Sequence, residues 1–186
     1  MPRLHLNEHN LFFFDSETGG LNAVEADMVQ VAVVLTDPTG ERVLEEFSAK
    51  VFPKKPVHPK AAAVNGYTVE KWASEAVELD GPMIKMLSMA RDAIFVAHNT
   101  PFDWSFFEAA MAQRQQRWPG DYHKIDTVAL ATPLLKFGRV ENLKLATLVS
   151  HFGYQQEAAH TALSDARDCR KVYLKLMERY QAAFAA

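Results

Sequence analysis

The chain has 186 residues, of which 48% are hydrophobic and 23% charged, and its net charge at pH 7 is −3. This length is enough for one domain with a substantial core, and the negative charge argues against a protein that wraps long duplex nucleic acid with a broad basic face. Binding of a short strand end is not excluded. The modest basic groupings fit phosphate contacts about as well as a solvated surface; they are Lys54, Lys55 and Lys60, and Lys136, Arg139 and Lys144.

The cysteine content and the N-terminus bear on the compartment. The single cysteine, Cys169, allows no disulfide within the chain, which is typical of proteins from reducing compartments. The apolar run Leu11–Phe14 is too short for a signal peptide or a membrane span. We therefore expect a cytoplasmic protein with no membrane contact.

Three successive strands are predicted in the first third of the chain. Leu11–Asp15 is apolar on both faces, which is typical of the centre of a sheet, and we expect this strand to end at Asp15. Met28–Thr36 and Val43–Phe52 flank the turn sequence Asp37-Pro38-Thr39-Gly40. This arrangement predicts an antiparallel hairpin.

Helices alternate with two short strands in the remainder of the chain. The order of the elements predicts an α/β fold with a mixed five-stranded sheet and helices on both faces. Asn99 or Thr100 is expected to cap the long helix before residue 115, and Asn142 the helix that ends at His151. We expect residues 1–10 to be an N-terminal extension and residues 11–181 to form a single domain. The expected helices are Lys60–Val64, Val69–Ala73, Pro82–Ala90, Pro101–Gln115, Val128–Leu135, Asn142–His151 and Ala162–Tyr180, and the strands are Ala93–Ala97 and Lys124–Asp126.

Two of these helices carry a carboxylate on their apolar face. Asp103 shares one side of its helix with Phe107, Ala110 and Met111. The second acid, Asp165, falls within the apolar stripe of the last helix. Both acids lie in a first turn, where the helix dipole favours the ionised form, but a carboxylate in apolar surroundings is costly unless a cation compensates it. The stripe of the last helix comprises Ala162, Ala166, Cys169, Val172, Tyr173, Leu176 and Tyr180.

Two further acids stand at the end of the first predicted strand. Asp15 and Glu17 project to the same side if the extended conformation continues past Asp15. Together with Asp103 and Asp165 they would repel one another unless divalent cations bound between them. All-oxygen ligands suit Mg²⁺ or Mn²⁺ better than zinc. A cap or a salt bridge would explain each acid alone, whereas the four together favour a metal site.

These residues lie in motifs that resemble a known family. The motifs are similar to the three exonuclease motifs of the DEDDh family, the RNase H-like 3′-5′ exonucleases that include the proofreading ε subunit of bacterial DNA polymerase III. The resemblance spans residues 11–175, nearly the whole chain, and implies an RNase H-like fold. The motifs are Asp15-Ser16-Glu17-Thr18-Gly19-Gly20, His98-Asn99-Thr100-Pro101-Phe102-Asp103 and His160-Thr161-Ala162-Leu163-Ser164-Asp165-Ala166, with further similarity at Ile125-Asp126-Thr127 and Asn65-Gly66-Tyr67-Thr68.

The resemblance also implies an activity and a role for each acid. The activity is metal-dependent hydrolysis from the 3′ end of single-stranded DNA or RNA, with release of nucleoside monophosphates. Asp15 would bridge two Mg²⁺ or Mn²⁺ ions, Glu17 and Asp165 would complete one site, and Asp103 would serve the other. Two ions about 3.5 to 4 Å apart can serve both the attacking hydroxide and the leaving oxygen. His160 would be the general base, since an imidazole titrates near neutral pH.

The residues beside the motifs are candidates for substrate binding. Backbone N–H groups of Thr18-Gly19-Gly20 could approach a terminal phosphate or sugar, because glycine has no Cβ. Many relatives have His in place of Asn65 and an aliphatic residue in place of Tyr67, so contacts with substrate can differ here. Aromatic rings can stack on the last bases, although helical spacing favours a core position for Phe106. We expect His98 and Asn99 chiefly to organise the strand end, and Asp126 to support the site. The candidates for substrate binding are Thr18, Gly19, Gly20, Leu21 as a wedge, Asn65, Tyr67, His98, Asn99, Phe102 and Phe106.

Two other functions stay open on the sequence. The chain could be a non-catalytic nucleic-acid or polymerase-binding module with the same fold, but such a module would not need all four acids and His160. It could also be a phosphoesterase of short oligoribonucleotides. The expected partner is the 3′ end of a single strand, with a homodimer or a polymerase complex as open alternatives. The lack of a long C-terminal tether weakly favours a free-standing enzyme.

Overall fold

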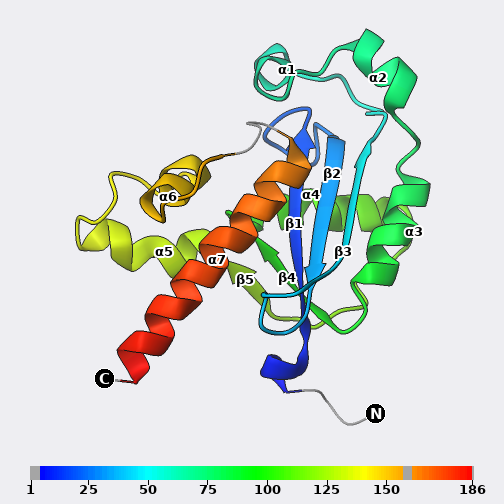
Figure 1. Cartoon of the computed structure of the whole chain (residues 1–186). Coiled ribbons are helices and arrows are strands. Elements are labelled where there is room, and N and C mark those ends of the chain that lie inside the picture. The colour runs from blue at the N-terminus through cyan, green and yellow to red at the C-terminus, as the bar shows by residue number, and fades with distance from the viewer. Residues whose placement is uncertain (1–4, 157–160, 186) are drawn as a thin grey trace.

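The computed structural model of the chain describes residues 5–156 and 161–185 (Figure 1). A short 3₁₀ helix, Leu6–Glu8, precedes the sheet. The strands are β1 (Asn10–Thr18), β2 (Met28–Thr36), β3 (Val43–Lys50), β4 (Ala93–Ala97) and β5 (Lys124–Asp126). The α-helices are α1 (Pro59–Asn65), α2 (Val69–Glu75), α3 (Asp80–Met89), α4 (Thr100–Gln113), α5 (Thr127–Lys136), α6 (Leu145–His151) and α7 (Ala162–Phe184).

Within the described residues, the five strands form one mixed sheet in the order β3-β2-β1-β4-β5. The central strand β1 pairs antiparallel with β2, where Phe13 lies opposite Val34, and parallel with β4, where Phe13 lies opposite Val96. The β2–β3 pair is antiparallel and the β4–β5 pair is parallel. The predicted α/β class with a mixed five-stranded sheet is confirmed.

Helices cover both faces of this sheet, and the alternation of β1 decides what each face packs against. Phe12 and Phe14 point to the face covered by α3 and α4, where Met83 and Phe107 join their cluster. Phe13 points to the opposite face and packs in the cluster that contains the apolar stripe of α7. Figure 1 shows α7 running across that face of the sheet. Each phenylalanine of the run is fully buried, and burial of each ring contributes roughly 2 to 3 kcal/mol to the stability of the fold. The well-packed centre of β1 therefore supports the end of the strand, where Asp15 and Glu17 lie.

Strand β1 is longer than the sequence predicted, and the difference matters for the site. We expected the strand to end at Asp15, but the ladder with β2 continues through Glu17, which lies opposite Gln30, to Thr18. The ladder with β2 outweighs the local cost of placing two acids in the strand. Asp15 and Glu17 are therefore both held in extended backbone and project to the same side of the sheet, as the motif required.

Two of the expected helix caps differ from expectation in their geometry or position. Asn99 is the N-cap of α4 as expected, but it lies in the left-handed region with φ of 70° and its side chain makes no capping bond. The expectation that Asn142 caps α6 is wrong, because Lys144 occupies that position. Asn142 Oδ1 instead accepts hydrogen bonds from Lys144 N at 2.9 Å and Thr147 Oγ1 at 2.8 Å, so it braces the first turn from outside.

The ends of the helices differ from the expected ranges by a few residues. Helix α7 continues to Phe184, beyond Tyr180, and α4 ends at Gln113 rather than Gln115. Gln115 itself has a φ of 53°, which is incompatible with a continuing right-handed helix. None of the helices in the described ranges combines the length and apolar character needed to cross a lipid bilayer.

Candidate active site

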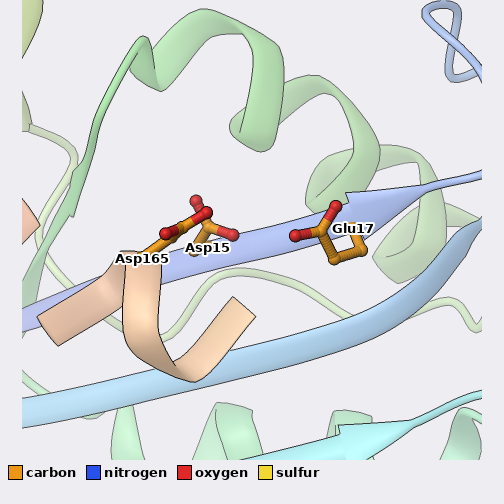
Figure 2. Close-up of side chains that lie close together, drawn as sticks. All are labelled: Asp15, Glu17 and Asp165. Carbon is orange, nitrogen blue, oxygen red and sulfur yellow. The ribbon is translucent and has the colours of Figure 1, made fainter. Parts of the chain in front are cut away.

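Three carboxylates meet where the end of β1 lies under the first turn of α7. Asp15, Glu17 and Asp165 each offer one oxygen, and these oxygens lie within 4.8 Å of one another. Figure 2 shows Asp165 extending from α7 toward Asp15, with Glu17 farther along the same strand. The donors are all carboxylate oxygens, so the group fits a hard divalent cation such as Mg²⁺ or Mn²⁺.

The fourth acid of the motifs, Asp103, reaches the same strand end from α4. Its side chain is buried, with 3% of the residue exposed. Asp103 Oδ1 accepts two hydrogen bonds from Ser16, from the backbone N at 3.1 Å and from Oγ at 2.8 Å. Ser16 lies between Asp15 and Glu17, and successive residues of a strand point to opposite faces. Ser16 therefore joins Asp103 to the strand whose neighbouring residues carry two of the other acids.

The four acids repel one another and are partly desolvated, so their ionised forms need a cation nearby. Burial raises the pKa of Asp15 well above its usual value, and the nearby charges of Asp103, Asp165 and Glu17 raise it further. Burial also raises the pKa of Asp103 to about 7, although the hydrogen bonds from Ser16 oppose the shift. Ionised carboxylates this close are stable only with a cation between them. The donor set and its charge both fit divalent ions.

A groove of about 860 Å³ runs beside Glu17. One side is the loop after β1 and the other is the segment that enters α1. Of the candidate substrate-binding residues, Thr18, Gly19, Gly20, Leu21, Asn65 and Phe102 line it. The opposite side was not predicted from the sequence, although the Pro-x-x-Pro spacing of Pro56 and Pro59 is a local signal for the entry to a helix. This side comprises Pro56, Val57, His58, Pro59, Lys60, Ala61 and Val64.

Gly19 does not present its backbone to the groove in the way we expected. Its N–H donates to Asp27 O at 2.8 Å, and its carbonyl accepts from His58 N at 2.8 Å. A Cβ at this position would lie 3.4 Å from Val57 Cγ2, so the glycine permits close packing of the two sides. The Gly19 N–H is therefore occupied within the protein and is not free to bind a phosphate.

Two of the aromatic candidates lie away from the groove lining. Phe106 is only 2% exposed and belongs to the core beneath α4, so it has no open face for a base. Its ring centre lies 5.1 Å from that of Phe102, which does line the groove. Tyr67 packs on Trp72, with ring centres 4.9 Å apart. Phe102 is thus the candidate aromatic residue that faces the substrate groove.

His98 makes structural contacts, as expected of a residue that organises the strand end. Its Nδ1 lies 2.9 Å from Thr127 Oγ1 and its Nε2 lies 2.9 Å from Leu143 O. Burial lowers the pKa of the imidazole, so the ring is neutral at pH 7. Both ring nitrogens are used, and His98 fixes the start of α5 and the segment before α6 beside the end of β4.

Asp126 supports the site in a similar way. Its Oδ1 accepts backbone hydrogen bonds from Asn99 at 3.0 Å, Thr100 at 3.4 Å and Val128 at 3.0 Å. One oxygen thus caps α5 and holds the left-handed Asn99 at the start of α4. Asp126 is not a member of the three-carboxylate group.

His160 lies outside the described residues, so its role as general base stays a prediction. Helix α7 begins at Ala162, and the side chain of its N-cap, Thr161, accepts a hydrogen bond from Ser164 N at 3.3 Å. This cap fixes the first turn of α7, on which Asp165 lies.

A mixed α/β sheet with clustered carboxylates at the end of its central strand defines the class of RNase H-like, metal-dependent nucleases. The model of the Exonuclease family (RNase_T) matches residues 12–173. The chain therefore belongs to the Exonuclease family and is a 3′-5′ exonuclease of the DEDDh type. The resemblance that the motifs indicated is confirmed.

Similar proteins differ widely in length. The chain is 26% identical over 178 residues to DNA polymerase III subunit epsilon of Treponema pallidum, covering 94% of this chain and 80% of that one. It is 28% identical over 165 residues to the PolC-type DNA polymerase III of Thermotoga maritima, covering 88% of this chain but only 12% of the polymerase. A DNA polymerase III subunit epsilon-like protein of Rhodobacter capsulatus is 32% identical over an alignment of 189 positions, which covers 95% of this chain and 25% of the relative.

Solved structures share the fold. Exonuclease I of E. coli in complex with single-stranded DNA superposes with a TM-score of 0.82 at 17% identity, over 95% of this chain and 42% of that one. Exonuclease I of Methylocaldum szegediense superposes with a TM-score of 0.77 at 20% identity, over 92% and 41%. The chain thus corresponds to less than half of these enzymes.

Proposed function

We propose that the chain removes nucleoside monophosphates from the 3′ end of single-stranded DNA with the help of two divalent cations, Mg²⁺ or Mn²⁺. The observation that carries the proposal is the group of Asp15, Glu17 and Asp165, with oxygens within 4.8 Å, beside a groove that Glu17 itself lines. The choice of single-stranded DNA is supported by the shared fold of E. coli exonuclease I, whose structure holds single-stranded DNA.

Each acid has its own part in this proposal. Asp15, Glu17 and Asp165 would hold one cation, and Asp15 and Asp103 would hold the other. When bound, the pair of cations lowers the pKa of the attacking water and stabilises the leaving 3′ oxygen. Ser16 keeps the Asp103 carboxylate aimed at the end of β1 through its two hydrogen bonds. His160 accepts the proton of the attacking water.

The groove holds the terminal nucleotide against these carboxylates. Phe102 offers an aromatic ring from the α4 side, and Lys60 offers a positive charge from the α1 side. Stacking of a base on an aromatic ring contributes about 1 to 3 kcal/mol and depends little on sequence. The groove therefore suits a substrate of general sequence, which is what degradation from an end requires.

The direct test uses 5′-labelled single-stranded DNA and RNA oligomers with Mg²⁺, with Mn²⁺ or with EDTA. We expect a ladder that shortens from the 3′ end on DNA with either metal and no cleavage in EDTA. The Asp15→Ala variant should be inactive, and Glu178→Gln, a change of an exposed acid at the far end of α7, should act like the wild type. Metal-independent cleavage, or no cleavage of any oligomer, would overturn the proposal. If RNA were cleaved faster than DNA, the proposed substrate would be single-stranded RNA instead of DNA.

The role of His160 needs its own variant. We expect His160→Ala to lose turnover by about 10² to 10⁴, the usual contribution of a general base, while binding of Mn²⁺ is largely kept. Normal turnover in this variant would remove His160 from the mechanism.

For the protein partner, we propose that the chain associates with a DNA polymerase. Its support is the names of the relatives, which are the epsilon subunit and the PolC-type form of DNA polymerase III. Sedimentation of the chain alone and mixed with the replicative polymerase of the same organism tests this idea. A new, faster species in the mixture supports it, whereas unchanged sedimentation of both components contradicts it.

A further inference from the structure

One residue, Asp27, contacts both sides of the groove. The loop wall is residues 18–20, from the last residue of β1 onward, and the helix wall is residues 56–61 at the entry to α1. The Asp27 carbonyl accepts a hydrogen bond from Gly19 N at 2.8 Å, which holds the loop wall. Its carboxylate Oδ2 accepts from Lys54 N at 2.8 Å and from Lys55 N at 2.9 Å, which holds the chain just before the helix wall.

The side chain of Lys55 completes this connection from the opposite direction. Its Nζ lies 3.1 Å from Asp27 Oδ1 and donates to Ala23 O at 3.1 Å and to Ala26 O at 3.3 Å. The Lys55 and Asp27 side chains are 28% and 18% exposed, so the ion pair is partly shielded from solvent. All three acceptors belong to residues 23–27, so the ammonium group is bound within the protein and is not left for a phosphate.

The charge state of Asp27 fits this arrangement. Partial burial raises its pKa, but the hydrogen bonds and the charge of Lys55, with the backbone bond from Lys54, bring the pKa below its usual value. Asp27 is therefore ionised at neutral pH, and its hydrogen bonds to the two backbone N–H groups are charge-assisted.

The two walls are also joined directly at Gly19. Its carbonyl accepts from His58 N on the helix wall at 2.8 Å, while its N–H is held by Asp27. Gly19, Asp27 and the entry to α1 thus form a closed path of hydrogen bonds around one end of the groove. Loss of the Lys55 charge would leave the Asp27 carboxylate held only by the backbone N–H groups of Lys54 and Lys55, so the separation of the walls would be less firmly fixed at this end.

We infer that Asp27 and Lys55 are positioning residues that set the separation of the groove walls and thereby the affinity for the terminal nucleotide. The inference rests on the proposed function of the groove. Neither residue belongs to the carboxylate group, so the chemical step should be unaffected. A loss of binding that is equal in the ground state and the transition state raises KM and leaves kcat unchanged.

The test compares Lys55→Met, which keeps the stem but removes the charge, with Lys55→Arg and Asp27→Asn. The matched control is Lys85→Met, which removes an ion pair of the same type between α3 and β3, where Lys85 contacts Glu45. On a single-stranded oligomer with Mg²⁺, we expect Lys55→Met and Asp27→Asn to raise KM about tenfold with kcat within about twofold of wild type. Lys55→Arg should restore KM to within about threefold, and Lys85→Met should match the wild type.

Binding gives a second readout that does not need turnover. In an Asp15→Ala background, anisotropy of a fluorescent oligomer should show Lys55→Met weakening the Kd about tenfold, with Lys85→Met unchanged. The double variant Asp27→Asn/Lys55→Met should bind no worse than either single variant, because the two residues act as one unit.

The outcomes separate this inference from the proposed function. Failure of the wild type to shorten any oligomer contradicts the proposed function, and the binding series then still decides the role of Asp27 and Lys55. Equal KM and Kd for Lys55→Met and Lys85→Met would overturn the inference. A fall in kcat at constant KM would overturn it too, because that pattern belongs to a residue acting on the reacting groups.

Discussion

Ser16 donates two hydrogen bonds to a single carboxylate oxygen of Asp103, although the two residues are 87 positions apart in the chain. The shorter of the two, at 2.8 Å, comes from the hydroxyl group. Because Ser16 lies between Asp15 and Glu17, it links the carboxylate of α4 to the strand that carries the other acids. The orientation of Asp103 therefore depends on a residue that is not itself a metal ligand.

The first prediction concerns this hydroxyl group. Ser16→Ala keeps the backbone bond and removes the bond from Oγ, so Asp103 should be less well oriented. We expect a loss of about tenfold in kcat and a weaker apparent affinity for Mn²⁺, as is usual when the partner of a metal ligand is removed. Ser105→Ala on the same helix removes a hydroxyl that bonds to Phe102 O and should behave like the wild type. An identical loss in both variants would point to α4 stability rather than to Asp103.

The second prediction concerns pH and metal. Burial raises the pKa of Asp103 to about 7 in the folded protein, above the value of about 3.9 in an unfolded chain. The folded state therefore binds the proton more tightly, and this contribution to stability is present at low pH and lost as pH rises toward about 7. For Asp103 alone the loss is up to about 4 kcal/mol, since each pKa unit corresponds to about 1.36 kcal/mol.

Thermal unfolding between pH 5 and pH 8 in EDTA measures this effect. We expect Asp103→Asn to be more stable than the wild type at pH 8 and to show a smaller decrease in Tm as pH rises. Added Mn²⁺ should raise the Tm of the wild type more at pH 8 than at pH 5, because metal binding requires ionised ligands. A metal-induced shift that is the same at both pH values would contradict the prediction.

The fold and the acids of the site could be predicted because both leave local signals. The run Leu11–Phe14 is apolar on both faces, which indicates a central strand, and Asp103 and Asp165 interrupt apolar helical stripes. The end of β1 could not be predicted, since pairing with β2 decides it and a single strand carries no record of its partner's length.

The second side of the groove could not be predicted from the sequence for a related reason. Val57 and His58 lie beside Gly19 only because the chain folds back after β3, and that contact joins residues far apart in sequence. Asp27 gives no local signal either, since a lone acid in a loop is ordinary. In contrast, the preference for a core position at Phe106 followed from helical spacing, and the structure places the ring there.

The third prediction concerns Asp126, whose Oδ1 accepts three backbone N–H groups. Asp126→Ala leaves these donors without an acceptor and should lower the free energy of unfolding by about 2 to 3 kcal/mol, from the lost cap of α5 and the freed Asn99 turn. Asp126→Asn keeps an oxygen at the same position and should lose less than half of that amount. Urea unfolding of the two variants in EDTA gives the comparison. Equal losses would assign the effect to the charge of Asp126 rather than to its hydrogen bonds.

The fourth prediction concerns the loop that leads into β5. A Cβ on Gly120 would lie 2.3 Å from Ala93 O, at the start of β4, and 2.8 Å from Ala90 O, at the C-cap of α3. Neither atom can move without disturbing a hydrogen bond, because Ala93 O accepts from Asp121 N and Ala90 O accepts from Ala93 N. We expect Gly120→Ala to destabilise the protein by about 1 to 3 kcal/mol, the range for overpacking that forces a backbone shift.

The matched substitution is Gly81→Ala in α3, where an added Cβ has no atom within 4 Å. Alanine is the better helix former, so this variant should be unchanged or more stable by up to about 1 kcal/mol. Urea unfolding measures both, and exonuclease assays at a temperature below both transitions should give wild-type kcat for each. If Gly120→Ala were as stable as Gly81→Ala, the loop would have to move away from β4 at little cost, and the close approach seen at Gly120 would not be what holds β5 beside the end of β4.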